Sequence, residues 1–198
     1  MKLIIPMAGR GTRVRPHSHV TPKPLLPVKG KSMVERIVDT FNRVLPRHLD
    51  TGVFVLGPDF GEEIRAQLRD ICARHHMTAH FAVQPMAEGT AHAVYCAGDH
   101  LEGEGIVVFA DTLFEMEPGI DLEGADVVMW VKEVDDPRRF GVAVRKGDRV
   151  VALVEKPSEP ISNEALIGIY YVRDLAVLRR YIQQLIDQDI RGHGGEFQ

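Results

Sequence analysis

A loop rich in glycine and arginine follows the first apolar segment of the chain. Residues 8–16 read AGRGTRVRP and come directly after a strand expected at Lys2–Pro6. Gly9 and Gly11 allow backbone N–H groups to approach a polyphosphate closely. A turn after the first strand of an α/β sheet lies at the carboxyl edge, where ligands bind. The loop therefore predicts a phosphate-binding site, and a solvated basic loop is the alternative.

Prolines distinguish this loop from two familiar nucleotide-binding turns. Four prolines between residues 16 and 27 disfavour a helix directly after the glycines. Rossmann dinucleotide turns and P-loops both open straight into a helix. We therefore expect an extended loop that carries Arg13 and Lys23 across the strand ends.

The elements that must position this loop alternate between strands and helices. Ser32 with Glu35, and Asp59 with Glu62, form capping-box patterns at the start of two helices with apolar stripes. Further strands are expected at Gly52–Leu56, Thr78–Val83 and Gly105–Ala110, and a further helix at Thr90–Leu101. This order predicts an open, largely parallel sheet with helices on both faces.

The second half of the chain has a more antiparallel pattern. Strand-like segments lie at Ala125–Val134, Phe140–Arg145, Arg149–Val154 and Leu166–Val172, and Gly147-Asp148 is a hairpin signal. Asp174 is expected to cap a last helix. The predicted fold is α/β: a Rossmann-like open mixed sheet with helices on both faces.

Composition limits the class of protein. The chain has 198 residues, of which 44% are hydrophobic and 26% charged. These values argue for one domain over 1–198 and exclude disorder, a collagen-like chain or a coiled coil as descriptions of the whole chain. The net charge of −4 provides no basic field for a nucleic acid, so no nucleic-acid partner is expected.

Cysteine usage and apolar run lengths indicate a cytoplasmic protein. Cys72 and Cys96 form neither a CxxC pair nor a disulfide framework. Apolar runs such as Ile106–Ala110 are too short to span a bilayer, and the opening residues lack the apolar region of a signal peptide. We expect no membrane association. The nine histidines include no group at zinc-ligand spacing.

The motifs together resemble a known enzyme family. The stretch IIPMAGRGTRVRP, followed by TPKPLLPVKGKSMVE, resembles the signature of sugar-1-phosphate nucleotidyltransferases, G-x-G-T-R-x-x-P and then P-K-P-L-L-P-V. The resemblance continues through VQPMAEGTAHA at 83–93, FADTLF at 109–114, FGVAV at 140–144, VEKP at 154–157 and IGIYYV at 167–172. Each piece is modest, but their order and spacing are specific.

The resemblance implies a reaction between a nucleoside triphosphate and a sugar 1-phosphate, with Mg²⁺ as cofactor. It would yield a nucleotide-sugar and pyrophosphate, as in glucose-1-phosphate thymidylyltransferases. The Gly-Thr-x-His-Ala stretch is similar to uridylyltransferases, so dTTP or UTP is favoured. Residues 1–111 would form the nucleotide-binding half and 112–198 the sugar-phosphate-binding half.

The same resemblance assigns roles to particular residues. Arg13 and Lys23 would act on the phosphates as catalytic residues, since fixed cations suit the charge that develops there. Asp111, at the end of an apolar strand, would bind Mg²⁺. The nucleotide would contact Ala8, Gly9, Gly11, Thr12, Gln84 and Gly89. The sugar phosphate would contact Gly141, Glu155, Lys156 and Gly168.

Two alternatives and one departure from the family pattern stay open. Family members usually carry a second metal-binding aspartate further along, so we expect this domain to be incomplete at its C-terminus, with Glu196 as another carboxylate that could complete the site. A catalytically inactive relative that senses sugar nucleotides is one alternative. A cytidylyltransferase acting on an alcohol phosphate is the other. The sequence leaves the sugar and the oligomeric state open, a homo-oligomer included.

Overall fold

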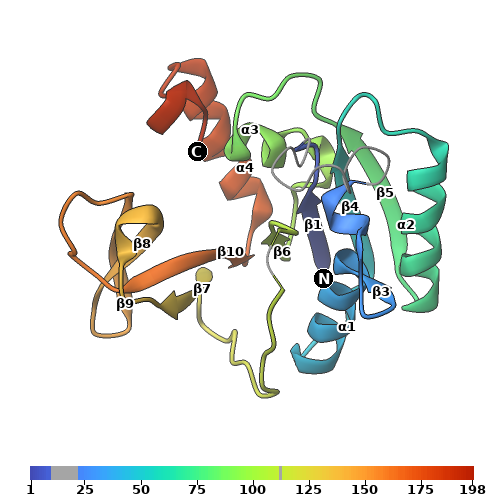
Figure 1. Ribbon diagram of the computed structural model, residues 1–198, viewed down its shortest axis with the longest axis horizontal. Coiled ribbons are helices and arrows are strands. Elements are labelled where there is room, and N and C mark those ends of the chain that lie inside the picture. The colour runs from blue at the N-terminus through green and yellow to red at the C-terminus, as the bar shows by residue number, and fades with distance from the viewer. Residues whose placement is uncertain (10–21, 112) are drawn as a thin grey trace.

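The computed structural model describes residues 1–9, 22–111 and 113–198. Eight strands in this part of the chain form one sheet in the order β5-β4-β1-β6-β10-β8-β9, and β7 pairs with β10 (Figure 1). These strands are β1 (Lys2–Pro6), β4 (Thr51–Leu56), β5 (Thr78–Val83), β6 (Gly105–Val108), β7 (Val127–Glu133), β8 (Gly141–Lys146), β9 (Arg149–Glu155) and β10 (Glu164–Val172).

The sheet changes character where β6 meets β10. Strands β5, β4, β1 and β6 run parallel to one another. Strand β10 is antiparallel to β6, and β7, β8 and β9 continue the antiparallel part. In Figure 1, β8 and β9 lie at the opposite end of the molecule from β5 and α2. The predicted mixed sheet is confirmed.

Helices cover both faces of the parallel part. They are α1 (Met33–Val44), α2 (Glu62–Arg74), α3 (Thr90–Tyr95) and α4 (Leu175–Asp187). Successive side chains of a strand point to opposite faces. Accordingly, Leu3 belongs to the buried cluster that includes Phe41 of α1 and Leu68 of α2. Its neighbour Ile4 belongs to a second cluster, with Leu175 of α4. In the described chain, no helix is both long and apolar enough to cross a membrane.

The ends of the helices confirm two of the predicted caps and correct one. The Ser32 hydroxyl accepts a hydrogen bond from the Glu35 backbone N–H at 3.1 Å. The Asp174 carboxylate accepts one from the Ala176 N–H at 3.0 Å. The predicted cap at Asp59 is wrong, because α2 begins after Gly61, which makes no side-chain cap.

The helix predicted over Thr90–Leu101 is also wrong in its second half. Helix α3 ends at Tyr95, and a separate 3₁₀ turn covers Gly98–His100. Gly98 has φ +62°, in the left-handed region, which an α-helix does not continue through. The pattern of apolar residues continues past the end of α3, because Leu101 is also buried.

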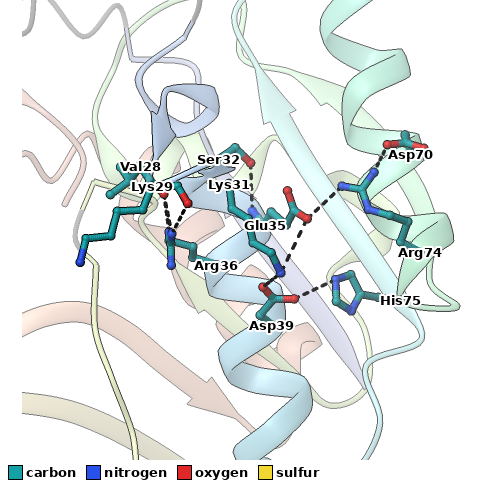
Figure 2. Close-up of polar contacts among 10 residues, drawn as sticks. All are labelled: Val28, Lys29, Lys31, Ser32, Glu35, Arg36, Asp39, Asp70, Arg74 and His75. Carbon is teal, nitrogen blue, oxygen red and sulfur yellow. Dashed lines mark hydrogen bonds and ion pairs between the residues drawn. The ribbon is translucent and has the colours of Figure 1, made fainter.

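The described part of the proline-rich segment, from Pro22 on, is not an extended loop throughout. Its first part forms a 3₁₀ turn over Lys23–Leu25, followed by the short hairpin of β2 (Pro27–Val28) and β3 (Lys31–Ser32). The Arg36 guanidinium of α1 donates to the Val28 carbonyl at 2.9 and 2.5 Å. This fork ties the hairpin to the first helix (Figure 2).

An ion-pair network continues from the hairpin to α2. Lys31 Nζ lies 2.7 Å from Asp39 Oδ2, and Asp39 Oδ1 lies 3.1 Å from His75 Nε2 (Figure 2). The Glu35 carboxylate lies 3.1 Å from the Arg74 guanidinium. The network therefore links β3, α1 and the end of α2.

Candidate active site

A cavity of about 560 Å³ lies where the parallel strands end. Ala8 and Gly9 line it just after β1, Gln84 just after β5, and Asp111 shortly after β6. The carboxyl ends of parallel strands meet at one edge of a sheet, which is where ligands bind in open α/β folds. The structure therefore brings together residues that are far apart in the sequence.

Six of the residues predicted to bind nucleotide, phosphate or metal line this cavity. They are Ala8, Gly9, Lys23, Gln84, Gly89 and Asp111. Gly11, Thr12 and Arg13 lie outside the described residues. Their assignment stays a prediction.

Lys23 reaches the cavity from a rigid turn. The buried Pro22 and Pro24 flank it, and its side chain is half-buried. Its ammonium group donates a hydrogen bond to the Asp111 carbonyl at 3.2 Å. Proline fixes φ near −65°, so this short turn presents the cation with little backbone freedom. The arrangement suits a fixed positive charge at a phosphate.

Gln84 is held from both its backbone and its side chain. Its backbone N–H donates to the Leu56 carbonyl at 2.9 Å, which extends the pairing of β5 with β4. The residue is only 6% exposed. Its Nε2 donates to the Gly89 carbonyl at 3.2 Å and lies 3.2 Å from His92 Nδ1. The amide is therefore ordered before any ligand arrives.

Gly89 meets the C-terminal segment. Its φ is +110°, and a Cβ there would lie 2.3 Å from the Phe197 carbonyl oxygen. The Phe197 N–H donates to the Glu88 carbonyl at 2.8 Å, and the Phe197 carbonyl accepts from the Ala91 N–H at 3.0 Å. This pairing brings Glu196 to the wall of the cavity. Only a glycine at position 89 permits so close an approach.

Three of the four predicted sugar-side residues form a separate group on β8, at the end of β9 and directly after it. Gly141 is the cross-strand partner of Glu155. A Cβ on Gly141 would lie 2.8 Å from Glu155 Oε2, so the glycine leaves space for that carboxylate. Lys156 Nζ lies 3.4 Å from Glu155 Oε1. The described lining of the 560 Å³ cavity does not include these three residues.

Gly168 connects the two groups through Phe109. Its φ is +78°, and its carbonyl accepts from the Phe109 N–H at 2.9 Å. Phe109 lines the cavity and meets the Tyr170 ring edge-on, with centroids 6.4 Å apart. Burial raises the pKa of Tyr170, and the Glu155 charge raises it further. The two groups are therefore neighbours on the same sheet.

The donors available to a metal are carboxylates. Asp111 and Glu196 both line the cavity. In the described part of the chain, no three His, Cys, Asp or Glu side chains gather as a metal-binding group. Mg²⁺ prefers oxygen ligands and takes several of them from substrate phosphates, so one or two carboxylates fit its chemistry.

Some contributors were not assigned from the sequence. Phe109 and His92 lie within the family-like stretches FADTLF and GTAHA, but no role was assigned to them. For Glu196 the only signal was its charge. Its position beside Gly89 depends on a contact between two distant segments.

Comparisons with known proteins identify the family of the chain. The family described as "Nucleotidyl transferase" matches residues 2–189. The low-salt glycan biosynthesis nucleotidyltransferase Agl11 of Haloferax volcanii is 30% identical over 182 residues, covering 86% of this chain and 48% of that protein. The UTP–glucose-1-phosphate uridylyltransferase AglF of the same organism is 29% identical over 178 residues, covering 86% of this chain and 71% of that protein.

A solved structure has the same fold. The crystal structure titled as a putative glucose-1-phosphate thymidylyltransferase from Bacillus anthracis, in complex with a sucrose, superposes with a TM-score of 0.76. It is 26% identical and covers 93% of this chain and 74% of that one. The chain spans about half the length of Agl11, at 48%. The chain belongs to the nucleotidyl transferase family, and its motifs place it with the sugar-1-phosphate nucleotidyltransferases.

Proposed function

We propose that this protein transfers a nucleotidyl group from a nucleoside triphosphate to a sugar 1-phosphate, releasing pyrophosphate and forming a nucleotide-sugar. The observation that carries the proposal is the cavity of about 560 Å³ at the ends of the parallel strands. It gathers Gly9 after β1, the Lys23 cation, the Gln84 amide and Asp111. AglF is named as a uridylyltransferase and the Bacillus anthracis protein as a thymidylyltransferase. Both names support dTTP or UTP as the donor.

The chemistry needs charge placement more than proton transfer. An oxygen of the sugar phosphate attacks the α-phosphorus, a new P–O bond forms, and the bond to the bridging oxygen of the β-phosphate breaks. Pyrophosphate leaves with that oxygen and its negative charge. The attacking phosphate is already ionised near neutral pH, so no general base is required. Lys23, and Arg13 from the loop outside the described residues, would hold phosphate oxygens as charge develops.

Mg²⁺ would be held by Asp111, and Glu196, which also lines the cavity, would contribute a second carboxylate. When bound, Mg²⁺ neutralises phosphate charge and orients the triphosphate. Lys23 donates to the backbone carbonyl of Asp111, so the cation is attached to the backbone that carries this carboxylate. On the sugar side, Glu155 would accept from hydroxyls and Lys156 would hold the sugar's phosphate.

A matrix of pyrophosphate-release assays tests the proposal. Each of dTTP, UTP, CTP, GTP and ATP is combined with several sugar 1-phosphates and with phosphocholine, in the presence of Mg²⁺. We expect release with at least one sugar 1-phosphate and dTTP or UTP. Release only with the pair of phosphocholine and CTP would show that the acceptor is an alcohol phosphate rather than a sugar 1-phosphate. Saturable binding without release from any pair would indicate the non-catalytic sensor.

A further inference from the structure

The hydrogen-bond partners of the Gln84 side-chain amide are compatible with only one of its two orientations. A backbone carbonyl can only accept hydrogen bonds, so the Gln84 group 3.2 Å from the Gly89 oxygen must be the NH₂. The second hydrogen of this NH₂ has an acceptor at His92 Nδ1, also 3.2 Å away. Both donors of the amide are thereby used, and the carbonyl Oε1 is what Gln84 can offer to a ligand in the cavity it lines.

His92 has neighbours that suit this role. For Nδ1 to accept from Gln84, the ring proton must lie on Nε2. On that side, Glu88 Oε2 lies 3.6 Å from Nε2 and Cys96 Sγ lies 3.7 Å from it. The ring side chain is 14% exposed, so it cannot turn freely away from these contacts. A carboxylate beside Nε2 favours the tautomer that leaves Nδ1 as an acceptor.

The C-terminal segment also contacts the Glu88 carboxylate. Glu88 Oε1 lies 3.6 Å from the Arg191 guanidinium. Arg191 in turn stacks over the Phe197 ring, 4.1 Å from its centroid. The orientation of His92 is therefore supported from α3 and from the segment that packs on Gly89.

We propose that His92 is a positioning residue that fixes Gln84 with its carbonyl toward the base of the nucleotide. The proposal rests on the proposed function, because it concerns the same cavity. It defines a class of bases by chemistry. An acceptor facing the base favours a ring nitrogen that carries a hydrogen, as in uracil, thymine and guanine, and disfavours cytosine and adenine, whose corresponding ring nitrogen is an acceptor.

Binding of matched nucleotide pairs tests the proposal without requiring turnover. UTP and CTP share ribose and triphosphate, as do GTP and ATP, so the ratio of dissociation constants within a pair isolates the edge of the base. Calorimetric titration with Mg²⁺ should show the wild-type protein favouring UTP over CTP. In His92→Leu this ratio should fall on the order of five-fold, as expected for loss of one orienting hydrogen bond.

Two conservative variants separate the acceptor from the bulk of the ring. Asparagine places its oxygen near the position of Nδ1, whereas glutamine places its oxygen near that of Nε2. His92→Asn should therefore retain the ratio within about two-fold, and His92→Gln should lose it as His92→Leu does. With an active sugar 1-phosphate, His92→Leu should raise KM for UTP with kcat nearly unchanged.

The outcomes distinguish this proposal from the proposed function. An unchanged ratio in both His92→Leu and His92→Gln would overturn the positioning role and leave the enzyme assignment intact. Equal losses in the asparagine and leucine variants would show that ring packing is what matters, and would also overturn it. A wild-type preference for CTP or ATP would refute the orientation of Gln84, whether or not pyrophosphate is released.

Discussion

Lys23 is the described cation that stands nearest to the proposed chemistry. It lies between two buried prolines, and its ammonium group is tied to the backbone of Asp111. A charge fixed in this way needs little reorganisation when a phosphate reacts, which is why such groups contribute more to the transition state than to substrate binding. Its value to catalysis should therefore exceed that of an ordinary surface lysine.

Replacing Lys23 tests this difference. Lys23→Ala should lower kcat on the order of 10²-fold, as for loss of one preorganised charge donor. Steady-state pyrophosphate release with the best substrate pair measures the change. Lys132→Ala, at an exposed position of β7, is the matched control and should be close to wild type. A raised KM with unchanged turnover would assign Lys23 to binding alone.

Gly89 is a residue whose side chain must be absent for the C-terminal segment to dock. In Gly89→Ala the new Cβ would meet the Phe197 backbone at 2.3 Å, so Phe197 and Glu196 should be displaced. Gly98→Ala is the control: Gly98 also has a positive φ, +62°, but nothing lies within 4 Å of its Cβ position.

The two glycine variants differ in backbone strain as well as in the clash, because Gly89 has φ 110° and ψ 178°, a region essentially restricted to glycine, whereas the φ of Gly98 is +62°. Urea unfolding should show Gly89→Ala to be less stable than Gly98→Ala by about 2 kcal/mol or more, since a buried aromatic ring is also lost from its site. Equal stabilities would mean that the C-terminal segment contributes nothing to folding.

At the scale of elements, the β2–β3 hairpin follows the Lys23 turn in the chain and is attached to α1 by the Arg36 side chain. It is too short to be stable alone, because two-residue strands bury little surface. The Arg36 fork supplies the missing attachment through the Val28 carbonyl and a further contact to the Lys29 carbonyl at 3.1 Å. The hairpin therefore depends on a side chain of the following helix.

Arg36→Ala should remove that attachment. We expect the free energy of unfolding to fall by about 1–3 kcal/mol, the range for hydrogen bonds from a charged group that leave acceptors unpaired. Arg43→Ala on the same helix removes a single long contact of 3.5 Å to the Met116 carbonyl, and should cost less than half as much. Chemical denaturation of the three proteins under one condition measures both values. A cost at Arg36 no larger than that at Arg43 would contradict the anchoring role.

At the scale of the whole molecule, a buried thiol reports on the packing of α2 against the sheet. Cys72 is fully buried, and a Cβ on Gly52 of β4 would lie only 3.0 Å from its sulfur. Burial raises the pKa of the Cys72 thiol from 9.0 to about 11. The unfolded chain therefore loses this proton at a lower pH than the folded protein does.

The raised pKa makes the fold sensitive to alkali. A group whose pKa is higher in the folded state stabilises the protein fully below its unfolded pKa and loses that contribution as pH rises through the folded pKa. Between pH 9 and 11, Cys72 should lower the free energy of unfolding by about 2–3 kcal/mol, at 1.36 kcal/mol per pKa unit. Denaturation in reducing buffer at several pH values measures how steeply the free energy of unfolding falls with pH. This slope should be smaller in Cys72→Ala than in Cys96→Ala. Identical slopes in the two variants would refute the contribution of Cys72 to the pH dependence of stability.

Local features of the sequence predicted most of the individual elements. Ser32 caps α1 and Asp174 caps α4 as expected, because a cap depends on residues within one turn of it. The apolar strands were placed to within a few residues for the same reason, since burial on the sheet imposes a local pattern. The errors at Asp59 and Gly98 are also local: α2 begins after Gly61, and Gly98 has φ +62°, through which an α-helix does not continue.

The sequence by itself determined the family, through the order of its motifs, and the alternation of strands and helices. Tertiary structure alone decided that β10 would enter the sheet beside β6, that Phe197 would pack on Gly89, and that His92 would hold Gln84. Helix and strand patterns arise from neighbours along the chain, whereas these contacts join segments whose approach depends on loop closure and on burial of the whole core. No periodicity in the sequence encodes them.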